Sequence, residues 1–312
     1  MTATTTYKVS PLPRCRTTYS TSRGTMVQGT LEKFFTRSKL QQYRKKIDLI
    51  FTSPPFPLNL KKTYGNYQGA AYLQWLTDFA PLFREILKPR GSIVIELGNA
   101  WEPGKPTMST LPIRALLGLQ ERGGFSLCQQ FIYYNPAKLP SPAHWVNIKR
   151  IRVKDAFTHI WWMSPSENPK ANNRKVLREY SPAMKNLLKS GTYNAGTRPS
   201  GHNISSTSFL RNNSGAIPSN VLIFSNTKSS DDYLKYCHEK HLPPNPSRMP
   251  EEIPEFFIKL LTKPHNLIFD PFAGSNTTGA VAERLKRRWL SIEPLREYVD
   301  GSFGRFINQK DE

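Results

Sequence analysis

The stretch Ile47-Asp48-Leu49-Ile50-Phe51-Thr52-Ser53-Pro54-Pro55-Phe56 joins an apolar run to two consecutive prolines. Aliphatic and aromatic runs of this length are typical of a buried strand. Each proline fixes φ and removes a backbone donor, so it cannot continue a central strand or enter a helix interior. The stretch therefore predicts a strand over residues 47–51 that ends in a rigid loop, at the edge where open α/β sheets bind their ligands.

The expected loop offers one hydroxyl (Ser53), free carbonyls and one aromatic ring (Phe56). Such a set suits a flat heterocycle that carries an amino group. An ordinary proline-rich turn is the alternative for this stretch taken alone, so the rest of the chain has to decide between them.

Strand and helix signals alternate on both sides of this loop, which predicts a doubly wound α/β fold. Expected strands cover residues 25–27, 92–97, 125–134, 157–163, 267–270 and 289–293. Expected helices cover residues 31–40, 72–87, 113–119 and 278–287, with a further helix starting near Pro254. Between residues 164 and 250 the periodicity fades and Asn, Ser, Pro, Gly and Lys dominate, which predicts an irregular insertion.

These patterns divide the chain into four parts. Residues 1–23 contain no acidic side chain and are expected to form a flexible basic arm. Residues 24–163 and 251–312 are expected to form two halves of one α/β domain, with residues 164–250 inserted between them. The Asn, Lys and Arg side chains of the insertion are of the types that contact phosphates and base edges.

Charge indicates the class of partner. The 312 residues carry 44 Lys and Arg against 23 Asp and Glu, a net charge of +21. So large a surplus favours a polyanion, and no stretch approaches the length of a membrane span, so nucleic acid is the expected partner. The three cysteines (Cys15, Cys128, Cys237) form no C-x-x-C pair, so we expect neither a zinc site nor a disulfide framework, as in a reducing cytosol.

A second motif, Asp270-Pro271-Phe272-Ala273-Gly274-Ser275-Asn276-Thr277-Thr278-Gly279, lies between an expected strand and helix. Small residues in such a turn allow close approach of a ligand. The motif lacks the Gly-Lys-Ser/Thr of a phosphate-binding loop. Glu293 ends the next expected strand, where a carboxylate binds ribose hydroxyls in dinucleotide folds. Together they indicate a nucleoside cofactor without a pyrophosphate, for which S-adenosylmethionine is the obvious candidate.

The Ser-Pro-Pro-Phe and Asp-Pro-Phe-Ala-Gly-Ser motifs together resemble the amino-methyltransferases of DNA restriction-modification systems. Serine at position 53 resembles the cytosine-N4 group, and the order of the motifs resembles the permuted β group, whose target-recognition region lies between them. The segments 135–142, 150–156 and 198–202 are also similar to that group. The resemblance covers about residues 24–306 and implies a Rossmann-like methyltransferase sheet with an inserted target-recognition region.

The resemblance implies a role for each motif. Its catalytic residues would be Ser53, Pro54, Pro55 and Phe56, with Glu96 either accepting a proton or acting as a structural acid. Its cofactor-binding residues would be Thr30, Asp270, Phe272, Gly274, Ser275, Thr277, Thr278 and Glu293. Candidate DNA contacts are Arg150, Arg152, Lys154, Arg198 and His202, the first three on one face of an expected strand. No metal ion is expected.

The implied reaction is methyl transfer from S-adenosylmethionine to the N4 amino group of a cytosine flipped out of double-stranded DNA. No cysteine follows a proline, so the covalent route of C5 methylation is not expected. The family setting implies a cytoplasmic, nucleoid-associated prokaryotic protein, a monomer or weak dimer. It would share its target site with a cognate endonuclease without needing to bind it.

Two alternatives remain open at this point. Adenine-N6 methylation uses similar pocket chemistry, and Ser53 is the main discriminator against it. A catalytically inactive DNA-binding relative is suggested only by two departures, Thr30 in place of an acid and Asn276 in place of a glycine. Asparagine tolerates left-handed backbone, so the turn is expected to survive.

Overall fold

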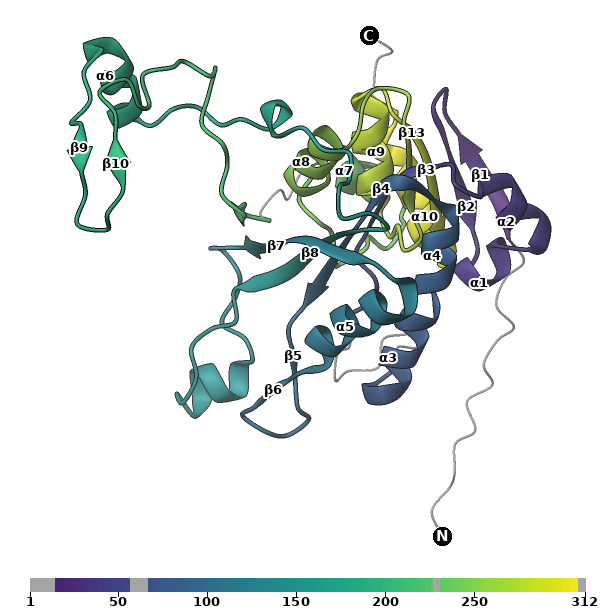
Figure 1. Ribbon diagram of the computed structural model, residues 1–312. Helices are drawn as coiled ribbons and strands as arrows, with labels where there is room; N and C mark the ends of the chain where they lie inside the picture. Colours follow the sequence, from purple (N-terminus) through teal and green to yellow (C-terminus); the bar gives the residue numbers. More distant parts are fainter. Residues whose placement is uncertain (1–14, 57–66, 227–230, 308–312) are drawn as a thin grey trace.

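The computed structural model describes residues 15–56, 67–226 and 231–307. Its centre is a nine-stranded sheet in the order β1-β2-β13-β12-β3-β4-β8-β7-β11 (Figure 1). The strands of this sheet are β1 (Arg16–Ser20), β2 (Gly24–Gln28), β3 (Ile47–Thr52), β4 (Leu87–Gly98), β7 (Ser126–Tyr134), β8 (Phe157–Ser164), β11 (Val221–Ile223), β12 (Leu267–Asp270) and β13 (Arg288–Glu293). Strands β2, β13, β12, β3 and β4 are mutually parallel, so their carboxyl ends meet at one edge.

Helices cover both faces of this sheet. One apolar core lies beneath α1 (Leu31–Phe34), α3 (Gly69–Asp78), α4 (Ala80–Ile86) and α5 (Leu111–Gly123). The other core lies beneath α8 (Glu252–Leu261), α9 (Thr277–Arg284) and α10 (Arg296–Ser302). The remaining elements are α2 (Arg37–Tyr43), α6 (Pro182–Ser190), α7 (Asp232–Glu239), the short helices η1 (His144–Ile148), η2 (Asn173–Lys175) and η3 (Phe303–Arg305), and the strand pairs β5 (Ala100–Trp101) with β6 (Met108–Ser109) and β9 (Gly196–Thr197) with β10 (Asn203–Ile204).

The predicted doubly wound α/β fold is confirmed, and each predicted strand outside residues 150–154 is present within a few residues of its expected bounds. The expected helix over residues 31–40 is wrong in one respect. It is broken into α1 and α2, because Thr36 leaves the helical conformation and its side chain accepts from Lys39 N to cap α2.

The expectation of a flexible arm is wrong for the part that the structure describes. Strand β1 pairs antiparallel with β2. The ring of Tyr19 packs against Trp289, Phe303 and Phe306, at centroid distances of 6.3, 5.3 and 5.7 Å. Pairing and aromatic packing therefore order a segment whose own sequence is polar. Residues 1–14 lie outside the described residues.

The part of the expected insertion, residues 164–250, that stands apart from the α/β body is shorter than expected. Helix α6 and the β9–β10 hairpin project well away from the central sheet (Figure 1). Strand β11, by contrast, joins the sheet edge parallel to β7, and α7 packs against η3 and α10. Residues 221–250 thus return to the α/β body, although they were expected to belong to the insertion.

Candidate active site

A row of polar side chains crosses the carboxyl edge of the sheet. Ser53 follows β3, and its hydroxyl forms a side-chain hydrogen bond with the Glu96 carboxyl group on the neighbouring β4. Thr158 of β8 donates to Glu96 Oε1 from the other side at 2.9 Å. Burial is the main cause that raises the pKa of Glu96, and these two hydrogen bonds oppose it. Glu96 is therefore a buried carboxyl group held directly beside Ser53.

The loop after Ser53 provides a rigid wall. Pro54 is buried, and Phe56 is partly buried at the margin of one apolar core. The Phe56 ring lies against the backbone of Gly98, where a Cβ would stand 2.5 Å from a ring carbon. Gly98 therefore leaves the space that the ring occupies, at the end of the same strand that carries Glu96. The expected catalytic residues are thus brought together.

Tyr133 extends this row and was not predicted. The register of β7, β8 and β4 places Tyr133 opposite Thr158, and Thr158 opposite Gly98. Within residues 15–56, 67–226 and 231–307, no group pairs with the buried Tyr133 hydroxyl. Sequence reasoning missed Tyr133 and Thr158 because only strand pairing brings them beside Glu96.

The turn between β12 and α9 is organised around Asp270. Thr52 and Thr278 hydroxyls donate to its two carboxylate oxygens at 2.7 Å each, and Phe272 N donates to Oδ1 at 3.1 Å. Burial raises the pKa of Asp270 to about 6. These contacts hold the turn and tie it to β3, and the expected contact of Asp270 with the cofactor stays a prediction.

Asn276 occupies the left-handed position of this turn, with φ 54° and ψ 39°. Its Oδ1 accepts from Gly279 N at 3.2 Å and from the Ser291 hydroxyl at 2.7 Å. Its Nδ2 donates to the Tyr19 hydroxyl at 3.1 Å. The expectation that the turn survives this departure from the family motif is confirmed, and Asn276 also caps α9.

Glu293 lies across from this turn at the end of β13. Its Oε2 accepts from Gly274 N at 2.9 Å and its Oε1 from Leu295 N at 3.0 Å. Burial raises the pKa of Glu293 to about 7, and the two backbone donors oppose that rise. Both carboxylate oxygens retain lone pairs that could accept from ligand hydroxyls.

The surroundings of Glu293 fit a nucleoside ligand. Thr30 follows β2, the strand beside β13, and its buried hydroxyl has no partner among the described residues. Gly274 has φ +51°, a left-handed backbone conformation that glycine adopts without strain. Phe272 lies 5.4 Å from Trp75, centroid to centroid, and forms part of an aromatic wall.

The expected strand over Arg150–Lys154 is wrong. This segment is a loop, in which Arg150 has φ 54° and Ile151 N bonds back to Trp145 O. The alternation of a strand is therefore lost, and the three basic residues do not share a strand face. Arg152 Nε donates to Pro106 O at 2.9 Å and Lys154 Nζ to Pro136 O at 3.1 Å.

The loop nevertheless lies near the carboxyl end of β4, the strand that carries Glu96. Asn99, directly after β4, donates to Asp155 Oδ1 at 2.8 Å. Arg198 and His202 lie elsewhere, at the tip of the β9–β10 hairpin, where Arg198 N bonds to His202 O. The candidate DNA contacts therefore form two separate groups, and their contact with DNA stays a prediction.

Two further features of the described residues bear on the class of site. They contain no cluster of three or more His, Cys, Asp or Glu side chains that could hold a metal ion. None of their helices is both long and apolar enough to cross a membrane.

Comparison with known proteins finds relatives of similar sequence and fold. Residues 47–303 match the family model described as DNA methylase. Type II methyltransferase M.PvuII from Proteus hauseri is 44% identical over 296 residues, which cover 93% of this chain and 85% of that protein. DNA adenine methyltransferase YhdJ from Escherichia coli (strain K12) is 24% identical over 263 residues, covering 82% of this chain and 74% of that protein.

Among solved structures, PvuII DNA methyltransferase (cytosine-N4-specific) superposes with a TM-score of 0.74 at 38% identity, covering 94% of this chain and 90% of that chain. The structure of M1.HpyAVI, at 18% identity and a TM-score of 0.52, covers 91% of this chain and 98% of that chain and shares the fold. Ser53 and the buried Glu96 lie together after β3 and on β4, and the turn that contacts Glu293 follows the adjacent β12. The family match and the identity to M.PvuII show that this chain belongs to the DNA methylase family.

Proposed function

We propose that this protein transfers a methyl group from S-adenosylmethionine to the N4 amino group of a cytosine in double-stranded DNA. The observation that carries the proposal is the Ser53 hydroxyl held against the buried Glu96. A serine, rather than an acid or amide, stands at the head of the Pro-Pro loop, and the similar PvuII enzyme is described as cytosine-N4-specific. Adenine-N6 transfer remains the second candidate because YhdJ is also a relative.

Ser53 and its neighbours are proposed to bind and activate the amino group of the target base. A cytosine within a duplex is stacked and paired, so it has to leave the helix to reach a buried pocket. In the pocket, Ser53 Oγ and the Pro54 carbonyl accept hydrogen bonds from the amino group, while Phe56 packs on the ring. Accepting these bonds draws the nitrogen towards tetrahedral geometry and exposes its lone pair. The proton that leaves passes through Ser53 to Glu96, whose raised pKa makes it a better acceptor than an exposed carboxylate.

The edge formed by β12, β13 and β2 is proposed to hold the methyl donor. When bound, S-adenosylmethionine supplies an electrophilic methyl group on a sulfonium centre. Glu293 accepts from the ribose hydroxyls, and Thr30 offers a hydroxyl that none of the described residues pairs with. The Gly274–Thr277 turn approaches the ligand with backbone, and Phe272 gives it an apolar wall. Because β3 and β12 are adjacent, the two ligands meet at one sheet edge, where positioning supplies much of the rate.

The direct test is incubation of the purified protein with methyl-labelled S-adenosylmethionine and duplex DNA of mixed sequence, followed by digestion to nucleosides. We expect label in N4-methyldeoxycytidine. Label in N6-methyldeoxyadenosine would support the second candidate, and DNA binding without any labelled nucleoside would support an inactive relative. A DNA-free reaction is the control for self-labelling of the protein.

The pKa of Glu293 predicts how donor binding depends on pH. A protonated carboxyl group accepts hydrogen bonds poorly, and the pKa of this group lies at about 7 in the free protein. Donor affinity should therefore rise as the pH rises through 7 and fall by up to about tenfold per pH unit below it. Isothermal titration of donor into protein at pH 6, 7 and 8 measures this. An affinity that is flat across that range would contradict the assigned role of Glu293.

The biological setting follows from the proposed reaction. N4 methylation at a specific site would protect DNA against an endonuclease that reads the same site, without contact between the two proteins. We propose a cytoplasmic protein acting at the nucleoid as a monomer or weak dimer. The net charge of +21 supports the DNA part of this setting, because a polyanion is the partner that such a surplus favours.

A further inference from the structure

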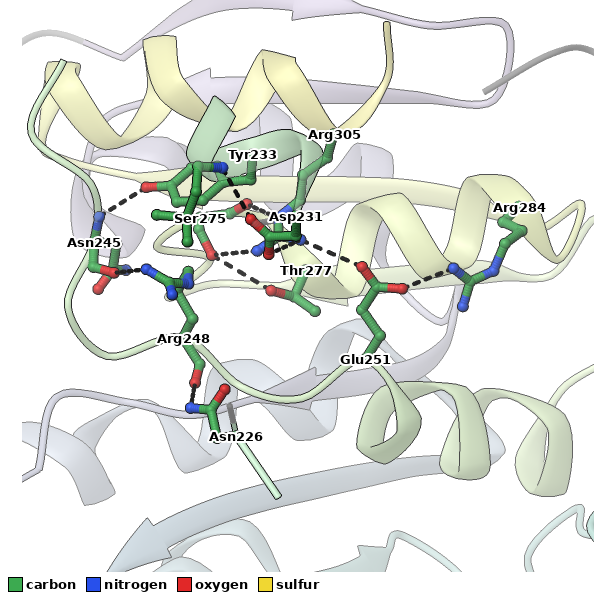
Figure 2. A network of polar contacts seen from close by, with 11 residues as sticks. Asn226, Asp231, Tyr233, Asn245, Arg248, Glu251, Ser275, Thr277, Arg284 and Arg305 are labelled. Atoms are coloured by element: carbon green, nitrogen blue, oxygen red, sulfur yellow. Dashed lines mark hydrogen bonds and ion pairs between the residues drawn. The ribbon is translucent and has the colours of Figure 1, made fainter. Parts of the chain in front are cut away.

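Arg305, in η3 near the end of the described chain, contacts Ser275 in the proposed donor turn, residues Gly274–Thr277 (Figure 2). Its Nε donates to the Ser275 carbonyl at 2.8 Å, and its Nη2 donates to the Ser275 hydroxyl at 3.2 Å. The Arg305 side chain is only 5% exposed. A buried two-pronged contact of this kind fixes both the position and the orientation of the backbone at Ser275.

The opposite side of the same guanidinium faces a different segment. Its Nη1 lies 3.4 Å from Glu251 Oε1 and 3.8 Å from Asp231 Oδ2. Its Cζ lies 4.8 Å from the centre of the Tyr233 ring. All three partners come from residues 231–251, the segment through which the chain returns from the projecting insertion to the α/β body (Figures 1 and 2).

A second contact joins the same segment to the donor turn without involving Arg305. At Gly274, a Cβ would stand 2.4 Å from Asn245 Nδ2, so the amide packs directly on the backbone of the turn. Asn245 is itself held by Tyr233, because Asn245 N donates to the Tyr233 hydroxyl at 2.7 Å. Residues 231–251 are therefore joined to the donor turn at two points, through Arg305 at Ser275 and through Asn245 at Gly274.

The chemistry at this position requires arginine and not only a positive charge. A buried cation is costly unless its partners compensate for lost hydration, and here two carboxylates do so. The planar fork directs Nε and Nη2 to Ser275 while Nη1 meets the acids. Lysine offers a single point charge and cannot satisfy both sides in that geometry.

We propose that Arg305 is a positioning residue for the methyl donor: it holds the Gly274–Thr277 turn in its binding geometry and joins that turn to residues 231–251. The inference rests on the proposed function, because it assumes that the turn binds S-adenosylmethionine. It predicts that a change in residues 231–251 alters the affinity for the donor, because this segment and the donor turn both contact the buried Arg305 side chain.

Arg284 provides a matched control. Its Nη1 pairs with Glu251 Oε2 at 2.8 Å and its Nη2 with Glu255 Oε2 at 3.0 Å, so it shares the partner Glu251 with Arg305 (Figure 2). Its side chain is 44% exposed, and within the described residues it pairs with these two carboxylates and not with the donor turn. An effect that arises only from releasing Glu251 would therefore appear in Arg284→Met as well.

The experiment compares wild type, Arg305→Lys, Arg305→Met and Arg284→Met in the full chain. Donor dissociation constants come from isothermal titration, and KM for donor, KM for DNA and kcat come from methylation assays. Loss of the two bonds to Ser275 should weaken donor binding about tenfold or more in Arg305→Lys and Arg305→Met. At saturating donor, kcat and KM for DNA should stay near the wild-type values. Arg284→Met should bind the donor as wild type does.

Asp231→Asn tests the link to the returning segment. The Asp231 side chain caps α7 by accepting from Leu234 N at 2.9 Å, and asparagine can keep that bond while removing the charge that faces Arg305. We expect weaker donor binding in this variant, although Asp231 is not one of the residues proposed to contact the donor.

Three results would overturn the inference. They are wild-type donor affinity in Arg305→Lys, an equal loss of affinity in Arg284→Met, and a fall in kcat at saturating donor with an unchanged KM for donor. If Arg305→Met fails to fold, Arg305→Lys decides, because it keeps the buried charge. Wild-type protein that binds no donor would instead refute the proposed function, and this inference with it.

Discussion

Ser53→Ala should lower the rate of methyl transfer by roughly 10²- to 10⁴-fold while donor and DNA affinities stay near wild type. The substitution removes one of the two proposed acceptors for the substrate amino group, and with it the hydroxyl that bonds to Glu96. It leaves the Pro54–Pro55 loop and the donor turn intact. Single-turnover transfer to a saturating DNA duplex, with donor binding measured in parallel, separates the chemical step from binding.

Ser92→Ala is the matched control for this prediction. Ser92 lies on the strand that carries Glu96, is 1% exposed, and accepts from Trp162 Nε1 at 2.9 Å. Its loss leaves a buried donor unpaired, which should cost about 1–3 kcal/mol of stability. The single-turnover rate should nevertheless remain at the wild-type value. A Ser53→Ala protein as active as Ser92→Ala would contradict the role assigned to Ser53.

Asn276→Ala should lower the free energy of unfolding by about 3–5 kcal/mol, the largest stability effect that we expect from one substitution in the donor turn. Alanine pays the cost of left-handed backbone at φ 54°. It also leaves the buried Gly279 N–H and the Ser291 hydroxyl without their shared acceptor. Urea unfolding monitored by tryptophan fluorescence gives the difference from wild type.

Asn276→Gly distinguishes the two causes. Glycine adopts left-handed backbone without strain, so this variant should recover about 1–2 kcal/mol of the loss and retain the cost of the missing hydrogen bonds. Equal stability of the alanine and glycine variants would mean that backbone strain contributes nothing. Wild-type stability in both would mean that the side-chain contacts of Asn276 contribute nothing.

Most of the sheet could be predicted from the sequence because its strands are short apolar runs with clear ends. The run before Ser53 and the run before Asp270 each stop at a proline or at small residues, and both became parallel strands with their ends at one edge. Local sequence decides such features. The tolerance of the turn for Asn276 was also predicted, from the resemblance to the family motif and from asparagine's acceptance of left-handed backbone.

What could not be predicted depends on contacts between distant parts of the chain. Tyr19 was expected in a flexible arm because nothing near it in sequence indicates that its ring packs on Trp289 and that its hydroxyl bonds to Ser302. Arg305 likewise lies 30 residues from Ser275, and a lone arginine has no motif. The segment 150–154 has the alternation of a strand, but a left-handed residue at Arg150 prevents one.

We expect an extruded cytosine to bind beside Ser53 and to receive the methyl group on its N4 nitrogen. The most direct measurement is a map of modified bases in DNA from a host without N4-methylcytosine that expresses either wild type or Ser53→Ala. Wild type should give N4-methylcytosine at one short recurring sequence, and Ser53→Ala should give none. N6-methyladenine at the recurring site, or an identical map from both proteins, would contradict this expectation.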